Sequence, residues 1–262
     1  MSGFVAALRV ELLKARRSVA PPLTGLAFAI APLVGGLFMY ILADPGRARR
    51  MGLIGQKAQL VGGGSDWPAY FAFLAQAATV GGFVLFAFVI AWVFGREFSD
   101  GTVRYLLALP TSRAAIIAAK LVVVALWCAA LTALVTLLGL VVGAALGLPA
   151  WSTGALWVGL AHVWGGAALT FLIVVPLALL AGVGRGYLAP LGFAMLMLIL
   201  AQVIGATGRG AWFPWSIPAL YAQVAGSAGG GVTAISFAIV AVTGAAGAAG
   251  TFAWWLYADF PR

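Results

Sequence analysis

The chain has 262 residues, of which 64% are hydrophobic and only 8% are charged, and its mean hydropathy is +1.09. About a quarter of the residues of a soluble domain are charged, so this composition excludes a soluble globular domain and indicates an integral membrane protein. The net charge of +9 does not indicate a nucleic-acid partner, because the basic residues are scattered at the ends of apolar stretches, where anionic lipid headgroups lie.

The pattern of residues 4–17 is that of an imperfect amphipathic helix. One arc is apolar, and arginines at its edge can extend toward headgroups. The arc consists of Phe4, Val5, Leu8 and Leu12, with Arg9 and Arg16 at its edge. We expect this helix to lie along the inner membrane interface, although an ordinary basic flank explains the pattern equally well.

Six stretches are long and apolar enough to cross a membrane, which requires about 20 residues. A turn at 147–154 divides the longest stretch, while Pro214, Pro218 and the glycines at 229–231 interrupt the last one. The expected spans are 19–42, 69–94, 114–145, 154–182, 187–206 and 232–256. Because these stretches lack the alternation of a membrane β-barrel, the sequence predicts an all-α protein with one transmembrane domain, residues 1–262.

The distribution of lysine and arginine predicts that both termini face the cytoplasm. With six spans the termini share one side, and cytoplasmic loops carry the excess of basic residues. Ten basic residues fall on the terminal side and five on the other. The five are Arg47, Arg49, Arg50, Lys57 and Arg209. The cluster 47–50 runs against the rule, because it lies just outside the first expected span.

A compact hydrophilic segment, residues 95–113, separates the second and third spans. Ser99 is placed to cap a short helix that begins near Gly101 and ends before Pro110, and Thr111 or Ser112 to cap the third span. Val103, Leu106 and Leu107 share a face of this short helix. The carboxylates of Glu97 and Asp100 could pair with a partner protein or with Arg96 and Arg104. A docking element and a plain interfacial loop are both compatible with the pattern.

Several single residues invite a functional reading that the pattern does not require. His162 is the only histidine and Cys128 the only cysteine, and both lie in apolar runs, where a buried hydrogen-bonding group and a small hydrophobe are typical. Pro176 should kink the fourth span. The stripe of Gly244, Gly247 and Gly250 indicates close packing within the chain.

The hydrophilic segment resembles a loop of the permease subunits of type-2 ATP-binding-cassette (ABC) exporters. The resemblance rests on Gly-Arg-Glu-Phe at the end of a span, then Asp-Gly-Thr, then Leu-Leu-Ala-Leu-Pro-Thr-Ser-Arg and a lysine seven residues later. The opening at 10–18 and the aromatic segment at 213–221 are similar to parts of the same family. Bacitracin- and lantibiotic-resistance permeases are the most similar in style.

This resemblance implies a coupling helix that docks on a separate ATPase subunit. The implied docking residues are Glu97, Phe98, Asp100, Gly101, Thr102, Leu106, Leu107, Pro110, Ser112 and Arg113. The outer segment 211–221 would close the outward end of the path, although a simple aromatic anchor explains it equally well. Its candidate gate residues are Trp212, Phe213, Pro214, Trp215, Pro218 and Tyr221.

The resemblance also implies partners and a location. The chain has no Gly-x-x-x-x-Gly-Lys-Ser/Thr loop of its own, so ATP and Mg²⁺ are expected in the partner ATPase, with no cofactor or metal in this chain. A second permease, identical or sister, should complete the path in the bacterial cytoplasmic membrane. Apolar cavity walls would suit a hydrophobic or amphipathic cargo.

Three other functions remain open. An ion-coupled transporter needs ionisable groups at membrane depth, but all six acidic residues flank the expected spans. An intramembrane enzyme would need a nucleophile with a base, or carboxylates with a metal, and one histidine supports this poorly. A non-transporting sensor or immunity subunit would carry the same docking loop. The acidic residues are Glu11, Asp44, Asp66, Glu97, Asp100 and Asp259.

Overall fold

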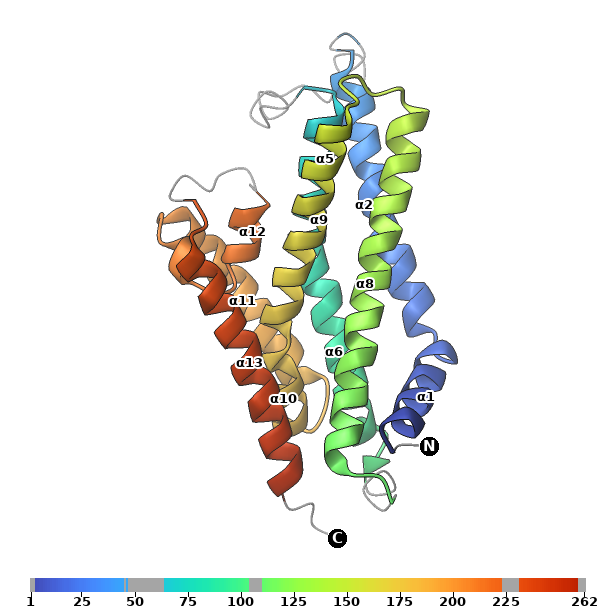
Figure 1. The fold of residues 1–262 in the computed structure, drawn as a ribbon, viewed down its shortest axis with the longest axis vertical. Helices are drawn as coiled ribbons and strands as arrows, with labels where there is room; N and C mark the ends of the chain where they lie inside the picture. Colours follow the sequence, from blue (N-terminus) through green and yellow to red (C-terminus); the bar gives the residue numbers. More distant parts are fainter. Residues whose placement is uncertain (1–2, 45, 47–63, 104–109, 223–230, 259–262) are drawn as a thin grey trace.

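The computed structural model describes residues 3–44, 46, 64–103, 110–222 and 231–258, and these residues form a bundle of helices with no strand among them (Figure 1). Six helical stretches in this part of the chain are long and apolar enough to cross a membrane. The chain is therefore an all-α multi-pass membrane protein.

The helices follow one another through short turns. The N-terminal half contains α1 (Gly3–Arg16), α2 (Ala20–Leu42), α5 (Trp67–Gln76), the π-helix η1 (Ala77–Gly81), α6 (Gly82–Ser99) and α8 (Arg113–Ala145). The C-terminal half contains α9 (Thr153–Val174), α10 (Pro176–Val183), α11 (Leu188–Ala206), the 3₁₀ helix η2 (Gly210–Trp212), α12 (Ile217–Tyr221) and α13 (Ala234–Tyr257). Pro176 interrupts the fourth span, which is consequently built from α9 and α10.

The spans begin where polar side chains cap them. Asp66 accepts a hydrogen bond from the amide of Ala69, and Ser152 accepts one from the amide of Ala155. Ser112 caps α8 in the same way, through the amide of Ala115, which confirms the cap expected for the third span. Each cap satisfies an amide that has no partner within its own helix.

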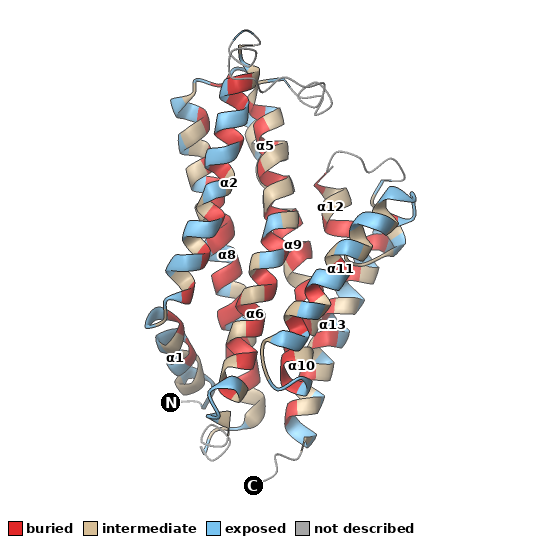
Figure 2. Cartoon of the chain, turned by 180° about the vertical axis from the view of Figure 1, so that it is seen from behind, coloured by how far each residue is buried: buried red, intermediate tan, exposed pale blue. Residues whose placement is uncertain are grey.

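The second and fourth spans form the centre of the bundle. In each of them 61% of the most apolar window is buried, against 22% for α11. Figure 2 shows the buried residues on the faces that the helices turn toward one another. Glycines permit the closest approaches: a Cβ atom at Gly247 would lie 2.6 Å from the backbone of Pro176, which supports the prediction that the α13 glycines pack within the chain.

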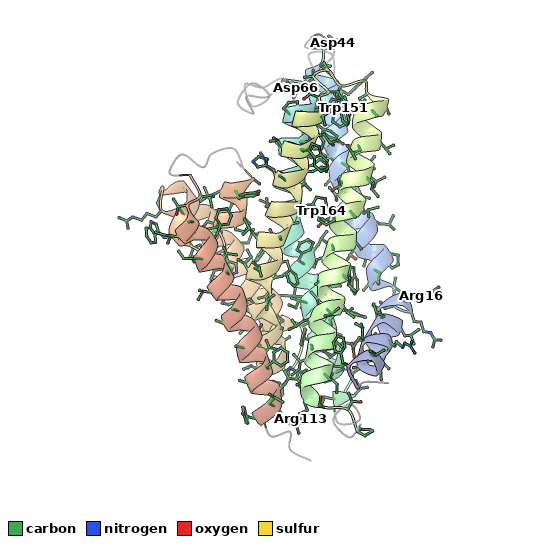
Figure 3. All side chains as sticks on the ribbon, viewed as in Figure 1. Arg16, Asp44, Asp66, Arg113, Trp151 and Trp164 are labelled. Atoms are coloured by element: carbon green, nitrogen blue, oxygen red, sulfur yellow. The ribbon has the colours of Figure 1, made fainter. Side chains whose placement is uncertain are left out.

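The two ends of the bundle differ in what they present. The start of α1, the start of α8 and the end of α13 lie toward one end, which we call the basal end (Figure 1). Arg113 lies at the basal end, whereas Asp44, Asp66 and Trp151 lie at the opposite end (Figure 3). The segment between α6 and α8 is therefore at the same end as both chain termini.

Candidate functional site

The segment between α6 and α8 is held at its first end by a glycine turn. The amide of Gly101 donates to the carbonyl of Phe98 at 3.2 Å, and the amide of Thr102 donates to the carbonyl of Glu97 at 2.8 Å. Gly101 has a φ of +67°, which glycine adopts at little cost. This turn corrects the prediction for Ser99: α6 runs through Ser99 and ends after it, so Ser99 does not begin a new helix.

The second end is anchored to the last turn of α13. The guanidinium of Arg113 donates to the carbonyls of Trp255 and Leu256 at 3.2 and 3.3 Å. Phe98 packs its ring against Trp254 and Trp255 of the same helix. The predicted docking residues Leu106 and Leu107 lie in 104–109, outside the described residues. Those docking residues that remain exposed are Asp100, Gly101, Thr102, Pro110 and Ser112.

The two carboxylates of the segment behave differently. Asp100 is exposed and accepts a hydrogen bond from Arg96 Nε at 3.1 Å, one turn back on α6. Glu97 is only 4% exposed, and its Oε1 accepts hydrogen bonds from Lys14 at 2.8 Å and from Lys120 at 2.7 Å. Glu97 therefore faces into the protein, and its partners are two lysines from α1 and α8.

Four charged side chains form a closed ring at this place, which we call the four-charge ring: Glu11, Lys14, Glu97 and Lys120. Glu11 completes it, because its Oε1 accepts from Lys14 at 2.7 Å and its Oε2 from Lys120 at 3.1 Å. Each acid thus contacts both lysines, and the charges alternate around the ring. Two acids and two lysines give the ring no net charge.

Burial makes this ring unusual for a basal surface. Glu11 is 5% exposed and Lys120 is 1% exposed. Burying an unpaired charge costs several kcal/mol, so a ring of this kind requires all its members. Oε2 of Glu97 is buried and accepts no hydrogen bond from the described residues.

The ring corrects one sequence expectation. Glu97 was expected to flank the second span, but the span helix continues to Ser99, so Glu97 lies in its last turn. The apolar run around Lys120 contained the signal, since a lysine two turns inside a hydrophobic helix needs buried partners. The identity of those partners, 23 and 109 residues away along the chain, follows only from the fold.

Electrostatics keep Lys14 charged. Partial burial lowers the pKa of Lys14, but the carboxylates of Glu97 and Glu11 raise it by more, so the net shift is upward. Lys14 therefore remains an ammonium ion at neutral pH, as the alternating arrangement requires.

The outer segment packs against the bundle through its aromatic residues. Trp215 stacks on Phe213 and on Phe193 of α11, and the hydroxyl of Tyr221 donates to the carbonyl of Ala161 on α9 at 3.1 Å. Pro218 is buried, whereas Trp212 is 68% exposed. The candidate gate residues are thus split between packed positions and an exposed tryptophan.

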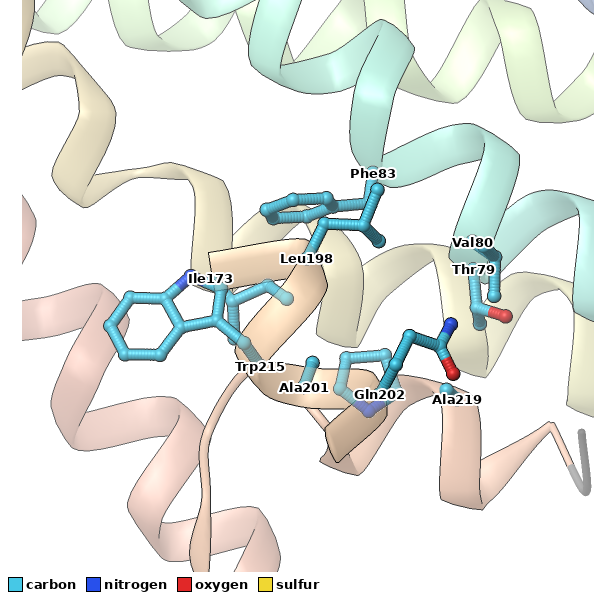
Figure 4. Close-up of a pocket in the computed structure, with 10 residues that line it drawn as sticks. Thr79, Val80, Phe83, Ile173, Leu198, Ala201, Gln202, Trp215 and Ala219 are labelled. Atoms are coloured by element: carbon cyan, nitrogen blue, oxygen red, sulfur yellow. The ribbon is translucent and has the colours of Figure 1, made fainter. Parts of the chain in front are cut away.

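Two cavities adjoin this outer segment. One, of about 30 Å³, lies beside Trp215 and Ala219 and reaches Thr79 of the π-helix and Gln202 of α11 (Figure 4). The other, of about 330 Å³, lies between α5 and α9 and reaches His162, which stacks on Tyr221. Both are lined mainly by apolar side chains.

Comparison with known proteins agrees with this architecture. A profile of the family described as "ABC-2 family transporter protein" matches residues 7–201. The "Bacitracin transport permease protein BCRB" of Bacillus licheniformis is 27% identical over 135 residues. That similarity covers 52% of this chain and 65% of the relative, so it spans less than two thirds of the relative's length.

Proposed function

Because the chain belongs to the ABC-2 family of transporter proteins, as the membrane subunit of an ABC transporter, we propose that it is the permease of an ATP-driven exporter and docks a separate ATPase through residues 95–113. ATP and Mg²⁺ bind in that ATPase. A second permease, either an identical copy or a sister chain, completes the path in the bacterial cytoplasmic membrane, and both termini face the cytoplasm.

The observation that carries this proposal is the anchoring of both ends of the segment at the basal end. Gly101 ends α6 in a fixed turn, and Arg113 ties the start of α8 to α13. Polar residues at these ends, among them Asp100 and Thr102, are exposed to a partner. A force applied here would pass directly into α6, α8 and α13.

The chemistry of the path supports a hydrophobic or amphipathic cargo. Both cavities beside the outer segment are lined mainly by apolar residues, with few polar groups such as Thr79, Gln202 and His162. The relative is named for bacitracin transport, so we propose a peptide antibiotic as the first cargo to test. Packing of Trp215 and Tyr221 on α11 and α9 supports closure of the outward end by 211–221.

A substitution at Gly101 tests the docking. Gly101→Trp places a bulky side chain on the exposed turn, where no atom lies within 4 Å of a Cβ. We expect the ATPase encoded beside this chain to stop co-purifying with it and ATP-dependent export to be lost. Gly147→Trp is the matched control, because Gly147 also has a positive φ and open space but ends α8 at the opposite end. Equal ATPase recovery with both variants would contradict the proposal.

The buried Glu97 is the one observation that favours an ion-coupled transporter. However, Glu97 pairs with lysines at the basal end, and among the described span residues no other Asp or Glu continues a relay across the bundle. Export that stops when the proton gradient collapses while ATP stays high would favour ion coupling. Docking without export would instead favour a sensor or immunity subunit.

A further inference from the structure

The face that α1 turns to the bundle is charged. Its buried residues are Glu11 and Ala15, whereas Val10, Leu12 and Leu13 are between 41% and 49% exposed. Apolar packing against the bundle is therefore small. We propose that the four-charge ring is what fixes α1 to the basal ends of α6 and α8, so that α1 and segment 95–113 move as one unit. The second half of this proposal rests on the proposed function.

Lys120 is the centre of this attachment. Its ammonium group has three N–H donors, and they reach Glu11 Oε2, Glu97 Oε1 and the carbonyl of Val93 at 3.1, 2.7 and 2.9 Å. One lysine on α8 thus holds α1 and the last turns of α6 at once. Glu97 lies directly before the turn at Gly101, so the ring and the start of the docking segment share one helix end.

Lys14 closes the ring from the other side. It reaches Glu11 on its own helix and Glu97 on α6, and so provides the second ionic link from α1 to the bundle. Removing Glu11 and Lys14 together leaves the Glu97–Lys120 pair in place with no net charge. The double variant Glu11→Gln/Lys14→Gln therefore removes the attachment of α1 while the buried pair within the bundle remains satisfied.

The position of α1 can be read by a disulfide without any ATPase. A Cβ atom at Gly3 would lie 3.5 Å from Cγ2 of Thr111, just before the start of α8, which is within reach of a disulfide. The reporter chain carries Gly3→Cys and Thr111→Cys, with the single native cysteine replaced by Cys128→Ala. The rate of disulfide formation is measured on the full-length chain in its membrane.

We expect the reporter to cross-link rapidly and Glu11→Gln/Lys14→Gln to slow this at least about tenfold, because each charge-assisted hydrogen bond contributes enough to change an equilibrium by that factor. The exchange Glu11→Lys/Lys14→Glu keeps the composition of α1 but places like charges together. It should slow cross-linking further. Arg16→Gln/Arg17→Gln, on the exposed end of the same helix, is the control and should leave the rate unchanged.

Unchanged cross-linking in both ring variants would overturn the proposal, and so would equal slowing in the arginine control. With the ATPase present, Glu11→Gln/Lys14→Gln should keep ATPase binding but lower export per ATP hydrolysed. Full coupling in a variant that no longer cross-links would overturn the shared movement. Failure of the unmodified chain to bind an ATPase would instead overturn the proposed function and leave the cross-linking result standing.

Discussion

Lys120 is a charged side chain two turns inside a hydrophobic helix, and its burial is tolerated because each N–H of its ammonium group has an acceptor. The same holds for Glu11, both of whose carboxylate oxygens are paired. The ring is therefore stable as a whole and vulnerable at each member. At the residue scale, the loss of one charge is more harmful than the loss of an oppositely charged pair.

The substitution Lys120→Met tests this difference. It leaves Glu11 and Glu97 buried with only Lys14 between them, so we expect a loss of about 3–5 kcal/mol in the free energy of unfolding. Thermal unfolding of the purified chain in detergent measures the effect. Glu11→Gln/Lys14→Gln, which keeps the remaining pair neutral, should cost less. A smaller loss for Lys120→Met than for this double variant would contradict the interpretation.

The helices α10 and α13 illustrate what decides packing at the element scale. Hydropathy makes both apolar on all sides, so it does not say which face meets which neighbour. The contact is set by Gly244, Gly247 and Gly250, which lie against Leu172, Pro176 and Leu179. Small residues let the two backbones approach closely in a lipid environment, where dispersion contacts take the place of the hydrophobic effect.

Replacing Gly247 by alanine should push α13 away from α10. The added Cβ would lie 2.6 Å from the Pro176 backbone, which cannot rotate away, so we expect a loss of about 1–3 kcal/mol. Gly192→Ala on α11 is the matched control, since no atom lies within 4 Å of its Cβ. It should be neutral or stabilising, because alanine favours helix more than glycine by about 1 kcal/mol. Thermal unfolding of both variants decides between these outcomes.

The whole molecule is polarised between its two ends. The basal end gathers the start of α1, both ends of the hydrophilic segment and the end of α13, while Asp44 and Asp66 lie at the opposite end (Figure 3). The even number of spans places the two chain termini together. The orientation of this arrangement in the membrane is a proposal that rests on the count of basic residues, ten against five.

Cysteine labelling in intact cells tests the orientation. In a chain with Cys128→Ala, a membrane-impermeant maleimide added from outside should label Asp44→Cys but not Asp100→Cys. After permeabilisation it should label both, since both positions lie outside the span helices. Labelling of Asp100→Cys from outside would invert the topology and remove the docking segment from the cytoplasm.

The sequence by itself determined the all-α membrane fold, the six spans and the hydrophilic segment after the second, because apolar length and turn residues are local properties of the chain. It also indicated Ser112 as a cap, which depends on a contact three residues away. Only the tertiary structure decided that Glu97 turns inward, since its partner Lys14 is 83 residues away along the chain. Local patterns carry no information about which helices become neighbours, and the pairing of buried charges depends on that neighbourhood alone.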